Sequence, residues 1–380
     1  MLYATPPLGD QDRRVLGEID DFYTAFLQAT GGSQPREWLG GVRKRLVAGA
    51  IQGSNTIEGY TVELSTASAI LDNAPMPADV PEETKQAVLG YRDALTWVMH
   101  SAEMDFFSHH EMVLSALHFM MTRAERDKSP GRYRRRDVIV TGQDPMVPAY
   151  VGPPADQVPE LMREFIDWLN NGDLQAHVLV RAAMAHLNLV SIHPWRDGNG
   201  RMSRCVQTLV IARDGRLAPE FCSIEEWLGH DINTLDYYRA LRETNQGSFQ
   251  PDRSAHAWLR FCVRAHHIQA QIVERRLKYS QNVWTAMENM TRRHGLNERV
   301  VSALYAAASA QLRREVYQQD EGLSRDQAIR DIRRLEHLGL LEAVGYGATL
   351  HYVAAGDAKD AATGIAASLT APATEPYDRS

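Results

Sequence analysis

Apolar residues recur every three or four positions through most of the first 280 residues, which is the spacing of one buried helix face. Three stretches show this pattern clearly, at 156–169, 177–190 and 202–210. The apolar positions of the first stretch are Val158, Leu161, Met162, Phe165, Ile166 and Leu169. We therefore predict a mainly α-helical protein.

The segment 133–154 departs from this pattern. Its sequence, YRRRDVIVTGQDPMVPAYVGPP, places a short β-branched run before Gly, Asp and Pro. β-branched residues favour strands, and Gly and Pro favour the turn that joins two strands. We predict a β-hairpin, or flap, on the helical body.

A different pattern follows a long helical stretch at about 256–292. Ser324 and Gln327 form an S-x-x-Q capping box ahead of an apolar stripe, which is the signature of a helix start. Gly339 ends that stripe, and a short hairpin is predicted to turn at 345–347. From about residue 355 the chain is rich in Ala, Thr, Gly and Asp, a composition that predicts a flexible tail.

The charge balance argues against a general affinity for nucleic acid or acidic membranes. The chain has 41 Lys+Arg against 48 Asp+Glu, a net charge of −7, so any polyanion site has to be local. The N-terminus lacks a signal pattern and no stretch is apolar enough to span a bilayer, which predicts a soluble, cytoplasmic protein without a membrane partner. The widely spaced Cys205, Cys222 and Cys262 are predicted to be reduced core residues.

The sequence HPWRDGNGRMSR, residues 193–204, gathers groups that suit phosphate chemistry. Gly-Asn-Gly lies at the start of a predicted helix, where unpaired N–H groups and the helix dipole attract anions. Arg201 and Arg204 beside it suggest a polyphosphate. Asp197 is a suitable ligand for Mg²⁺, and His193, with an ordinary pKa of about 6.5, can take a proton from a hydroxyl. Together they indicate attack on a nucleotide phosphate.

This segment resembles the core motif of the Fic family, H-x-F-x-[DE]-G-N-G-R-x-x-R, and differs from it only at Trp195, in the aromatic slot. The resemblance covers about residues 100–270. It implies a Fic-type helical bundle with a β-hairpin flap. It also implies a protein adenylyltransferase, which transfers AMP from ATP to a hydroxyl of a target protein and uses Mg²⁺.

The resemblance also assigns roles to residues of the motif. His193 would deprotonate the target hydroxyl, which attacks the α-phosphate and releases pyrophosphate, and Asp197 would hold Mg²⁺. Gly200 favours AMP transfer, because a Lys there marks the Doc branch, which transfers the γ-phosphate. The phosphates would be held by an anion hole and two arginines: Gly198, Asn199, Gly200, Arg201 and Arg204.

The flap and a tyrosine pair complete the predicted substrate site. In Fic proteins the flap binds the target polypeptide by strand addition, which gives register with little sequence specificity. Tyr237 and Tyr238 match a family segment near the nucleotide base, and packing in the core is an equally good interpretation of them. The flap residues predicted to bind the target are Val138, Ile139, Val140, Thr141 and Gly142.

Ser54, Glu58 and Gly59 meet a second family motif, [ST]-x-x-x-E-[GN]. It resembles the inhibitory helix of Fic proteins, in which Glu58 would pair with Arg204 and deny it to the γ-phosphate. Two alternatives stay open: the enzyme principally removes AMP, with Glu58 positioning a water, or the chain is a nucleotide-sensing transcriptional regulator. The presence of His193 favours an enzyme, since sensing needs no base.

The C-terminal part resembles a winged helix, with SRDQAIRDIRRLEHLGLL as its recognition-helix region. DNA binding through this module and protein docking or homodimer contact are the alternatives. We predict an N-terminal helical segment carrying the inhibitory motif, a Fic catalytic domain, a winged-helix-like domain and a flexible tail, at 1–95, 96–280, 290–354 and 355–380.

Overall fold

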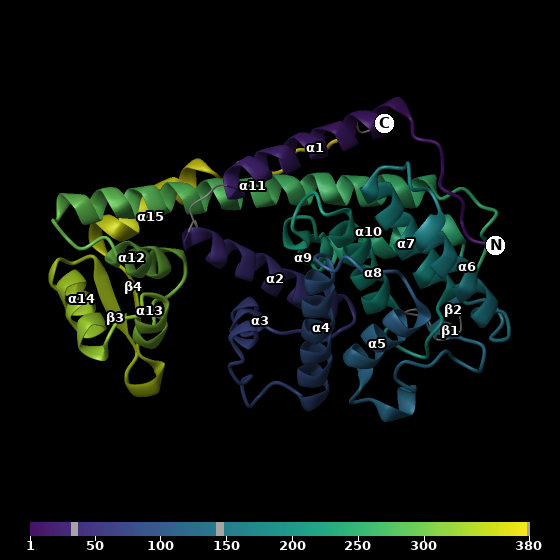
Figure 1. Ribbon diagram of the computed structural model, residues 1–380, viewed down its shortest axis with the longest axis horizontal. Helices are drawn as coiled ribbons and strands as arrows, with labels where there is room; N and C mark the ends of the chain where they lie inside the picture. Colours follow the sequence, from purple (N-terminus) through teal and green to yellow (C-terminus); the bar gives the residue numbers. More distant parts are fainter. Residues whose placement is uncertain (32–36, 142–147, 378–380) are drawn as a thin grey trace. The chain divides into compact units, whose positions relative to one another are not determined.

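The chain folds mainly into helices, as the sequence predicts. The computed structural model describes residues 1–31, 37–141 and 148–377. It has two units: one comprises Met1–Tyr23, Arg43–Ala270 and the C-terminal residues from Glu375, and the other comprises Thr24–Val42 and Gln271–Thr374. Three helices pass from one unit into the other: α1 (Asp10–Thr30), α2 (Glu37–Ile57) and α11 (His256–Arg293) (Figure 1).

The centre of the first unit is a pair of buried helices, α7 (Val178–Ile192) and α8 (Asn199–Asp214), which pack along each other. Almost every residue of both helices is buried, which is the state of a helix that is enclosed on all sides. Further contacts surround this pair, with α4 against α5 and α8, and α6 against α7. These surrounding helices are α4 (Glu82–Ser101), α5 (Glu111–Thr122) and α6 (Val158–Asn171).

The first unit does not divide where the sequence suggested. The predicted boundary between residues 95 and 96 is wrong, because it falls inside α4. The Pro-containing stretch at 73–83 forms a loop up to residue 81 and then enters α4. The remaining short helices of this unit are α3 (Leu64–Ala69), η1 (Ile70–Asp72), η2 (Arg126–Lys128), η3 (Pro219–Phe221), α9 (Glu225–Leu228) and α10 (Asp231–Asn245).

The predicted flap is an antiparallel hairpin of β1 (Ile139–Thr141) and β2 (Pro148–Val151). Ile139 lies opposite Val151 in this pair. On its other side β2 meets residues 247–249: the Val151 N–H donates to the Gly247 carbonyl at 2.9 Å, and the Phe249 N–H donates to the Val151 carbonyl at 3.2 Å. Among the described residues, β1 is therefore the outer strand. Gly142, also predicted for the flap, lies outside the described residues.

Within the second unit, residues 300–354 form three helices followed by a hairpin, which is the order of elements in a winged helix. The predicted capping box is present, since the Gln327 N–H donates to Ser324 Oγ and the Ser324 N–H donates to Gln327 Oε1. The elements of this winged-helix-like segment are α12 (Val300–Ser309), α13 (Arg314–Asp320), α14 (Arg325–His337), β3 (Leu341–Val344), η4 (Gly347–Thr349) and β4 (His351–Ala354).

The prediction of a flexible tail from about 355 is wrong for most of that segment. Residues Gly356–Ser368 form α15, which contacts α12. Ala358 and Ala362 are buried one turn apart on the same face. Alanine is the strongest helix former, and its small side chain lets this helix pack closely. A composition that resembles a linker therefore encodes a short packed helix.

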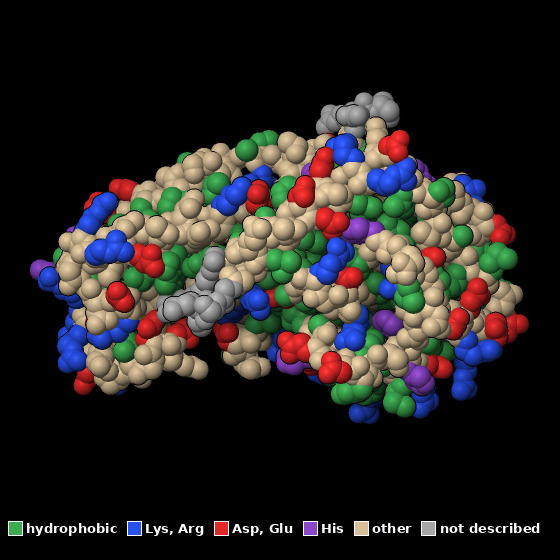
Figure 2. All heavy atoms as spheres, turned by 45° about the horizontal axis from the view of Figure 1, so that its top comes forward, with side chains coloured by type: hydrophobic (Ala, Val, Ile, Leu, Met, Phe, Trp, Pro, Cys, Tyr) green, Lys and Arg blue, Asp and Glu red, His purple; other side chains and the backbone are tan. Residues whose placement is uncertain are grey.

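The distribution of charged side chains agrees with the nearly balanced charge of the sequence. Lys and Arg side chains are interspersed with Asp and Glu over the face shown in Figure 2. On α14 the exposed Arg330, Arg333 and Arg334 share one face, and whether that face binds DNA or protein stays a prediction.

All three cysteines are free and buried, as expected. Among the described residues, no helix is both long and apolar enough to cross a bilayer.

Candidate active site

His193 lies at the C-terminal end of α7, where the chain turns out of the helix. Its backbone is left-handed, with φ 51° and ψ 57°. Its ring Nδ1 lies 3.1 Å from the Val190 carbonyl oxygen. Because a carbonyl only accepts, Nδ1 carries the proton and Nε2 keeps its lone pair. Nε2 is therefore the basic atom of this side chain.

The surroundings of His193 keep the imidazole neutral. Burial lowers its pKa to about 4, the hydrogen bond with the Val190 carbonyl opposes this shift, and the nearby positive charge of Arg134 adds to it. A neutral imidazole at pH 7 has a free lone pair and can accept a proton. The geometry thus suits the predicted role of a general base.

Arg134 ties the turn at His193 to both ends of the flap. The side chain is buried, with 8% of its surface exposed. Its Nε donates to the His193 carbonyl at 2.8 Å, Nη1 to the Arg136 carbonyl at 3.1 Å and Nη2 to the Pro153 carbonyl at 2.6 Å. Arg136 precedes β1 and Pro153 follows β2. One guanidinium therefore positions the histidine relative to the flap.

The turn between α7 and α8 is fixed by side chains of the motif itself. The Trp195 N–H donates to Asn199 Oδ1, and Asn199 Nδ2 donates to the Trp195 carbonyl, both at 2.9 Å. The side chain of Asn199 thus shapes the turn, and its backbone N–H is the part left for an anion. The Trp195 ring is fully buried, which fits the aromatic slot of the motif.

His118, on α5, supports the same turn. Its ring stacks on Trp195 with 4.6 Å between centroids. Its Nδ1 accepts from the Gly131 N–H at 2.8 Å, so Nε2 carries the proton and donates to the Asp197 carbonyl at 2.9 Å. Burial lowers the pKa of His118 to about 4, which keeps this tautomer neutral. His118 therefore has a positioning role.

Gly198 starts α8 and shapes the predicted anion cradle. It adopts φ 73°, a left-handed conformation that glycine reaches without strain. The first turn of α8 then presents unpaired N–H groups and the positive end of the helix dipole. At Gly200 a Cβ would lie 2.2 Å from Glu58 Oε1. The carboxylate of Glu58 therefore lies against the cradle, where only a glycine leaves room for it.

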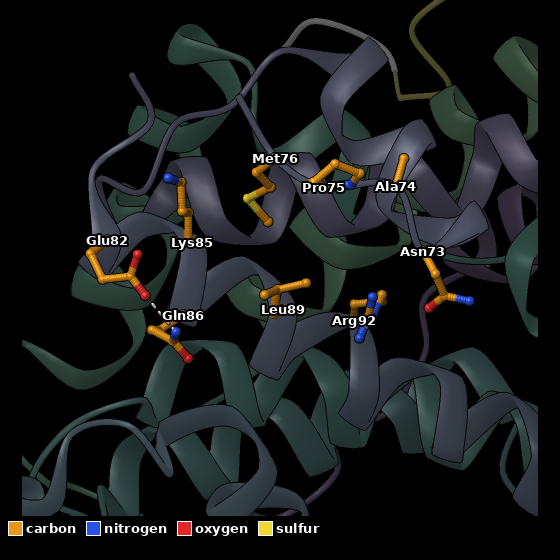
Figure 3. Close-up of a pocket in the computed structure, with 9 residues that line it drawn as sticks. All are labelled: Asn73, Ala74, Pro75, Met76, Glu82, Lys85, Gln86, Leu89 and Arg92. Atoms are coloured by element: carbon orange, nitrogen blue, oxygen red, sulfur yellow. Dashed lines mark hydrogen bonds between the residues drawn. The ribbon is translucent and has the colours of Figure 1, made fainter. Parts of the chain in front are cut away.

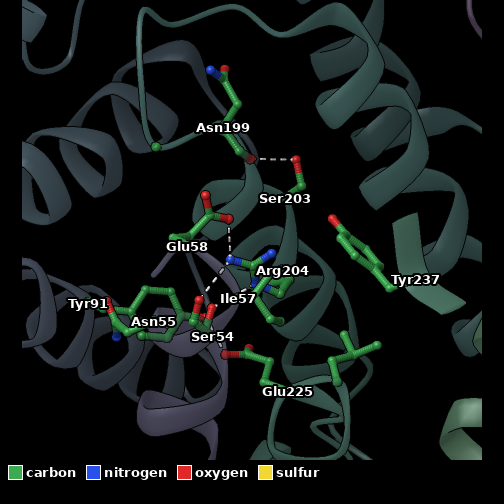
Figure 4. A network of polar contacts seen from close by, with 12 residues as sticks. Ser54, Asn55, Ile57, Glu58, Tyr91, Asn199, Ser203, Arg204, Glu225 and Tyr237 are labelled. Atoms are coloured by element: carbon green, nitrogen blue, oxygen red, sulfur yellow. Dashed lines mark hydrogen bonds and ion pairs between the residues drawn. The ribbon is translucent and has the colours of Figure 1, made fainter. Parts of the chain in front are cut away.

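Arg204 is held by the predicted inhibitory segment, residues 54–59, through three hydrogen bonds (Figure 4). Its Nε donates to Ser54 Oγ at 2.8 Å, and its Nη2 donates to the Ser54 carbonyl at 2.9 Å and to Glu58 Oε1 at 2.7 Å. The arginine is 1% exposed and Glu58 is 26% exposed. The predicted pair is thus present and shielded. Gly59 follows with φ 88° and turns the chain away from α2.

Arg201 is buried without a full set of partners. Its side chain is 1% exposed, and neither Nε nor Nη1 has a hydrogen-bond partner among the described residues. The Tyr60 ring covers the guanidinium at 5.1 Å, and Glu125 Oε1 lies 4.0 Å from Nη2. A buried guanidinium with unpaired donors is costly. Arg201 therefore presents unused donors beside the cradle.

Asp197 is the carboxylate predicted to bind Mg²⁺. Its Oδ1 accepts from the Gly198 N–H at 2.6 Å, and its Oδ2 accepts from Lys128 Nζ at 2.5 Å. Burial opposes ionisation, but these two bonds and the charge of Lys128 lower its pKa overall. An ionised carboxylate next to a phosphate cradle fits Mg²⁺, which binds through one or two carboxylates and the phosphates. No group of three or more possible metal ligands occurs in the described part of the chain.

The two tyrosines predicted near the base have different surroundings. Tyr237 is 1% exposed, and its hydroxyl lies 3.1 Å from His186 Nε2 in the core. Tyr238 is 48% exposed, and its hydroxyl donates to the Ile57 carbonyl at 3.3 Å. Only Tyr238 is open enough in this conformation to contact a base. The base-binding role of the pair stays a prediction.

The flap presents an open strand edge. Val151 directs its N–H and carbonyl toward residues 247–249, so Ile139 and Val151 form a non-hydrogen-bonded pair. In such a pair the opposite residue points its own N–H and carbonyl outward. Ile139 therefore offers a donor and an acceptor at the outer edge, and its side chain is 60% exposed. Of the other predicted flap residues, Val138 directly precedes Ile139 and Thr141 ends β1. Val140 pairs with Tyr150 of β2.

Four residues of the site carry no signal in the sequence motifs. They act through contacts between distant parts of the chain, and the charged run around residue 134 looks like an ordinary exposed segment. The one sequence feature that could have indicated them is this run of charged residues between the end of a helix and the start of a strand. The four residues are Tyr60, His118, Lys128 and Arg134.

A separate pocket of about 370 Å³ lies between the loop at 73–76 and α4 (Figure 3). No residue of the 193–204 motif lines it. Two of its lining residues already bond to each other, since Gln86 Nε2 donates to Glu82 Oε1 at 2.7 Å. The pocket thus has no part in the cradle.

Comparison with known proteins places the motif in a family. Residues 108–211 match the Fic/DOC family. The protein adenylyltransferase Fic of Nematostella vectensis is 28% identical over 274 residues, which are 69% of this chain and 56% of that protein. The chain spans about half the length of the curated relatives it matches.

Solved structures have the same fold. A Fic family protein from Desulfovibrio desulfuricans matches with a TM-score of 0.57 and 23% identity, over 93% of this chain and 98% of that chain. Fic-1 of Caenorhabditis elegans matches with a TM-score of 0.57 and 22% identity, over 71% and 73% of the two chains. These structures share the fold, and residues 108–211 carry the match to the Fic/DOC family.

Proposed function

We propose that the protein is an adenylyltransferase that transfers AMP from ATP to a hydroxyl side chain of a target protein, and that Glu58 inhibits it. Its relatives named protein adenylyltransferase support this function. The residues of the site support it independently, through an anion cradle, a neutral base and an open strand edge.

One observation carries the proposal: the unpaired donors of buried Arg201 beside the N-terminus of α8. A buried charged group without partners costs at least about 1–3 kcal/mol, so such a group is retained where a ligand satisfies it. An anion is the ligand that pairs with both a guanidinium and a helix N-terminus. A nucleotide polyphosphate provides several such oxygens in one molecule.

His193 would act as the general base. Its Nε2 takes the proton of the target hydroxyl as the oxygen attacks the α-phosphorus, and the bond to the pyrophosphate leaving group breaks. The Nδ1 bond to the Val190 carbonyl holds the ring in the tautomer that this step requires. Arg201 and the N–H groups of Asn199 and Gly200 would stabilise the negative charge on the phosphates, while the N–H of Gly198 holds Asp197.

Asp197 would hold Mg²⁺, which when bound neutralises charge on the phosphates. The hydrogen bond from the Gly198 N–H orients the carboxylate toward the start of α8. Its lowered pKa keeps it ionised, and therefore able to bind a cation, throughout the physiological pH range.

The contacts of Arg204 are strong enough for inhibition. Biasing an even equilibrium to 99:1 takes about 2.7 kcal/mol. An exposed salt bridge supplies about 0–1 kcal/mol, which is too little. Hydrogen bonds to charged groups contribute about 1.5–3 kcal/mol each, and Arg204 makes three of them with Ser54 and Glu58 in a buried setting. The inhibitory segment would thus withhold Arg204 from a terminal phosphate.

The test is transfer of label from α-labelled ATP with Mg²⁺ to the protein itself and to a cell lysate. Glu58→Gly is expected to raise labelling by up to about a hundredfold, the ratio set by a 99:1 bias. Adding His193→Ala to that variant should abolish it. Glu63→Gly, which removes an exposed glutamate a few residues away, is the matched control and should behave like the unaltered protein. Equal labelling in all four would contradict the proposal.

Removal of AMP is the second candidate activity. The observation that favours it is the position of Glu58, whose carboxylate lies against Gly200 in the cradle, where it could orient a water. Incubating a labelled target with the unaltered protein and with Glu58→Gly separates the two activities. Faster loss of label with the unaltered protein would make removal the principal reaction.

A further inference from the structure

A lysine ammonium bridges two carboxylates beside the phosphate cradle. Lys128 Nζ lies 2.5 Å from Asp197 Oδ2 and 3.3 Å from Glu125 Oε2. All three side chains are largely sheltered, with 30%, 32% and 18% of their surfaces exposed for Lys128, Asp197 and Glu125. None of the family motifs includes Glu125 or Lys128.

Two carboxylates in this place need a cation. They lie near the start of α8, and Glu125 Oε1 is 4.0 Å from Nη2 of Arg201, the residue with unpaired donors. A phosphate bound there would be repelled by both carboxylates unless a positive charge lay between them. Mg²⁺ in nucleotide sites is held by one or two carboxylates together with the phosphates. In this structure, the Lys128 ammonium supplies this charge.

We propose that Glu125 is a second carboxylate of the metal site, alongside Asp197, and that Lys128 is an internal cation that occupies this site until the metal arrives with the nucleotide. This inference rests on the proposed function, because it concerns the metal of the same site. It assigns a metal-binding role to Glu125 and a competing role to Lys128.

The arrangement has a physical consequence for loading. A metal ion that binds without nucleotide must displace Lys128 from Asp197. Its only protein ligands are then the two carboxylates. A metal that arrives with ATP brings phosphate oxygens, which can also accept the displaced ammonium. Lys128 would therefore weaken binding of the free metal and make it depend on the nucleotide.

Mn²⁺ binding to the full chain without nucleotide tests this directly, with electron paramagnetic resonance used to measure free Mn²⁺. Lys128→Met should tighten Mn²⁺ binding by about tenfold or more, because it removes a positive charge from between two carboxylates. Adding Glu125→Gln to that variant should reverse most of the gain. Lys44→Met is the matched control, since Lys44 pairs with Asp72 in the same unit and is similarly exposed, and it should leave the affinity unchanged.

The outcomes separate the inference from the proposed function. If Lys128→Met binds Mn²⁺ as weakly as the unaltered protein does, or if Glu125→Gln changes nothing in that background, the inference is wrong. Neither result depends on AMP transfer. Conversely, a protein that transfers no AMP but shows the expected Mn²⁺ affinities would overturn the proposed function and leave the metal site standing. Unchanged thermal unfolding temperatures would establish that each variant is folded.

Discussion

At the scale of single residues, the active-site geometry depends on side chains outside the motif. Arg134 directs its donors to main-chain carbonyls on both sides of the flap and at His193. His118 fixes the carbonyl of Asp197. Neither side chain is expected to touch the substrate, yet together they set where the proposed base, His193, and the proposed metal ligand, Asp197, lie. We therefore expect the chemistry of the motif to depend on these two supporting residues.

Arg134→Gln should lower AMP transfer in the Glu58→Gly background by about tenfold to a hundredfold, because displacements of about 1 Å at a reacting group have effects of this size. ATP affinity should change little, since Arg134 does not contact the cradle. Initial rates of labelling and ATP binding by calorimetry provide the two readouts. Arg132→Gln, which alters an exposed arginine nearby, is the control. A rate equal to that of the control would contradict the positioning role.

At the scale of elements, the sequence predicted the helices and strands that have a clear local pattern of residues. The stripes at 156–169, 177–190 and 202–210 correspond to α6, α7 and α8, and the β-branched run corresponds to β1. The capping box at Ser324 marks the start of α14. Local spacing is sufficient for such elements because burial of one face determines their period.

Other elements depend on contacts that no local pattern records. Residues 356–368 form a helix because small alanines pack against α12, although their composition resembles a linker. The Pro-containing loop at 73–83 resembles a domain boundary, but α4 beyond it packs on α8. Lys128 and Arg134 were missed in the site for the same reason, since their partners lie about 60 residues or more away along the chain.

The open edge of β1 leads to a prediction about target binding. Ile139→Pro should reduce labelling of protein targets in the Glu58→Gly background, because it removes the N–H that faces the outer edge while leaving the bonds between β1 and β2 intact. ATP binding should persist. Ile139→Ala keeps the N–H and should retain labelling. If Ile139→Pro labels targets as well as Ile139→Ala does, strand addition at this edge is wrong.

At the scale of the whole molecule, one unit contains the entire proposed mechanism. The inhibitory turn at 54–59, the motif at 193–204 and the flap all belong to the first unit. Glu58 and Arg204 are 146 positions apart in the chain, yet they meet within that unit. The contact proposed to inhibit the enzyme is therefore formed within a single chain.

Five buried or partly buried histidines are expected to make the stability of the fold depend on pH. Burial lowers the pKa to about 4 for His109, His118 and His193 and to about 3 for His186 and His266. The unfolded chain binds protons at these residues below about pH 6.5, whereas the folded chain does not until about pH 4. The free energy of unfolding should thus fall as pH falls through this window, by up to about 1.4 kcal/mol per pH unit for each histidine.

Urea unfolding at several values between pH 7.5 and about pH 4.5 measures this dependence. His186→Gln should give a shallower fall, because it removes one of the buried groups, whereas the exposed His100→Gln should match the unaltered protein. A free energy of unfolding that is constant across this window would contradict the account of the buried histidines.

The central claim is that this site transfers the AMP moiety and that Glu58 prevents it. The most direct measurement compares ATP labelled in the α-phosphate with ATP labelled in the γ-phosphate, using Glu58→Gly and the same protein target. The account predicts that protein acquires the α-label alone and that the γ-label leaves in pyrophosphate. Protein carrying the γ-label would indicate phosphate transfer instead, and the absence of either label while ATP still binds would contradict the claim.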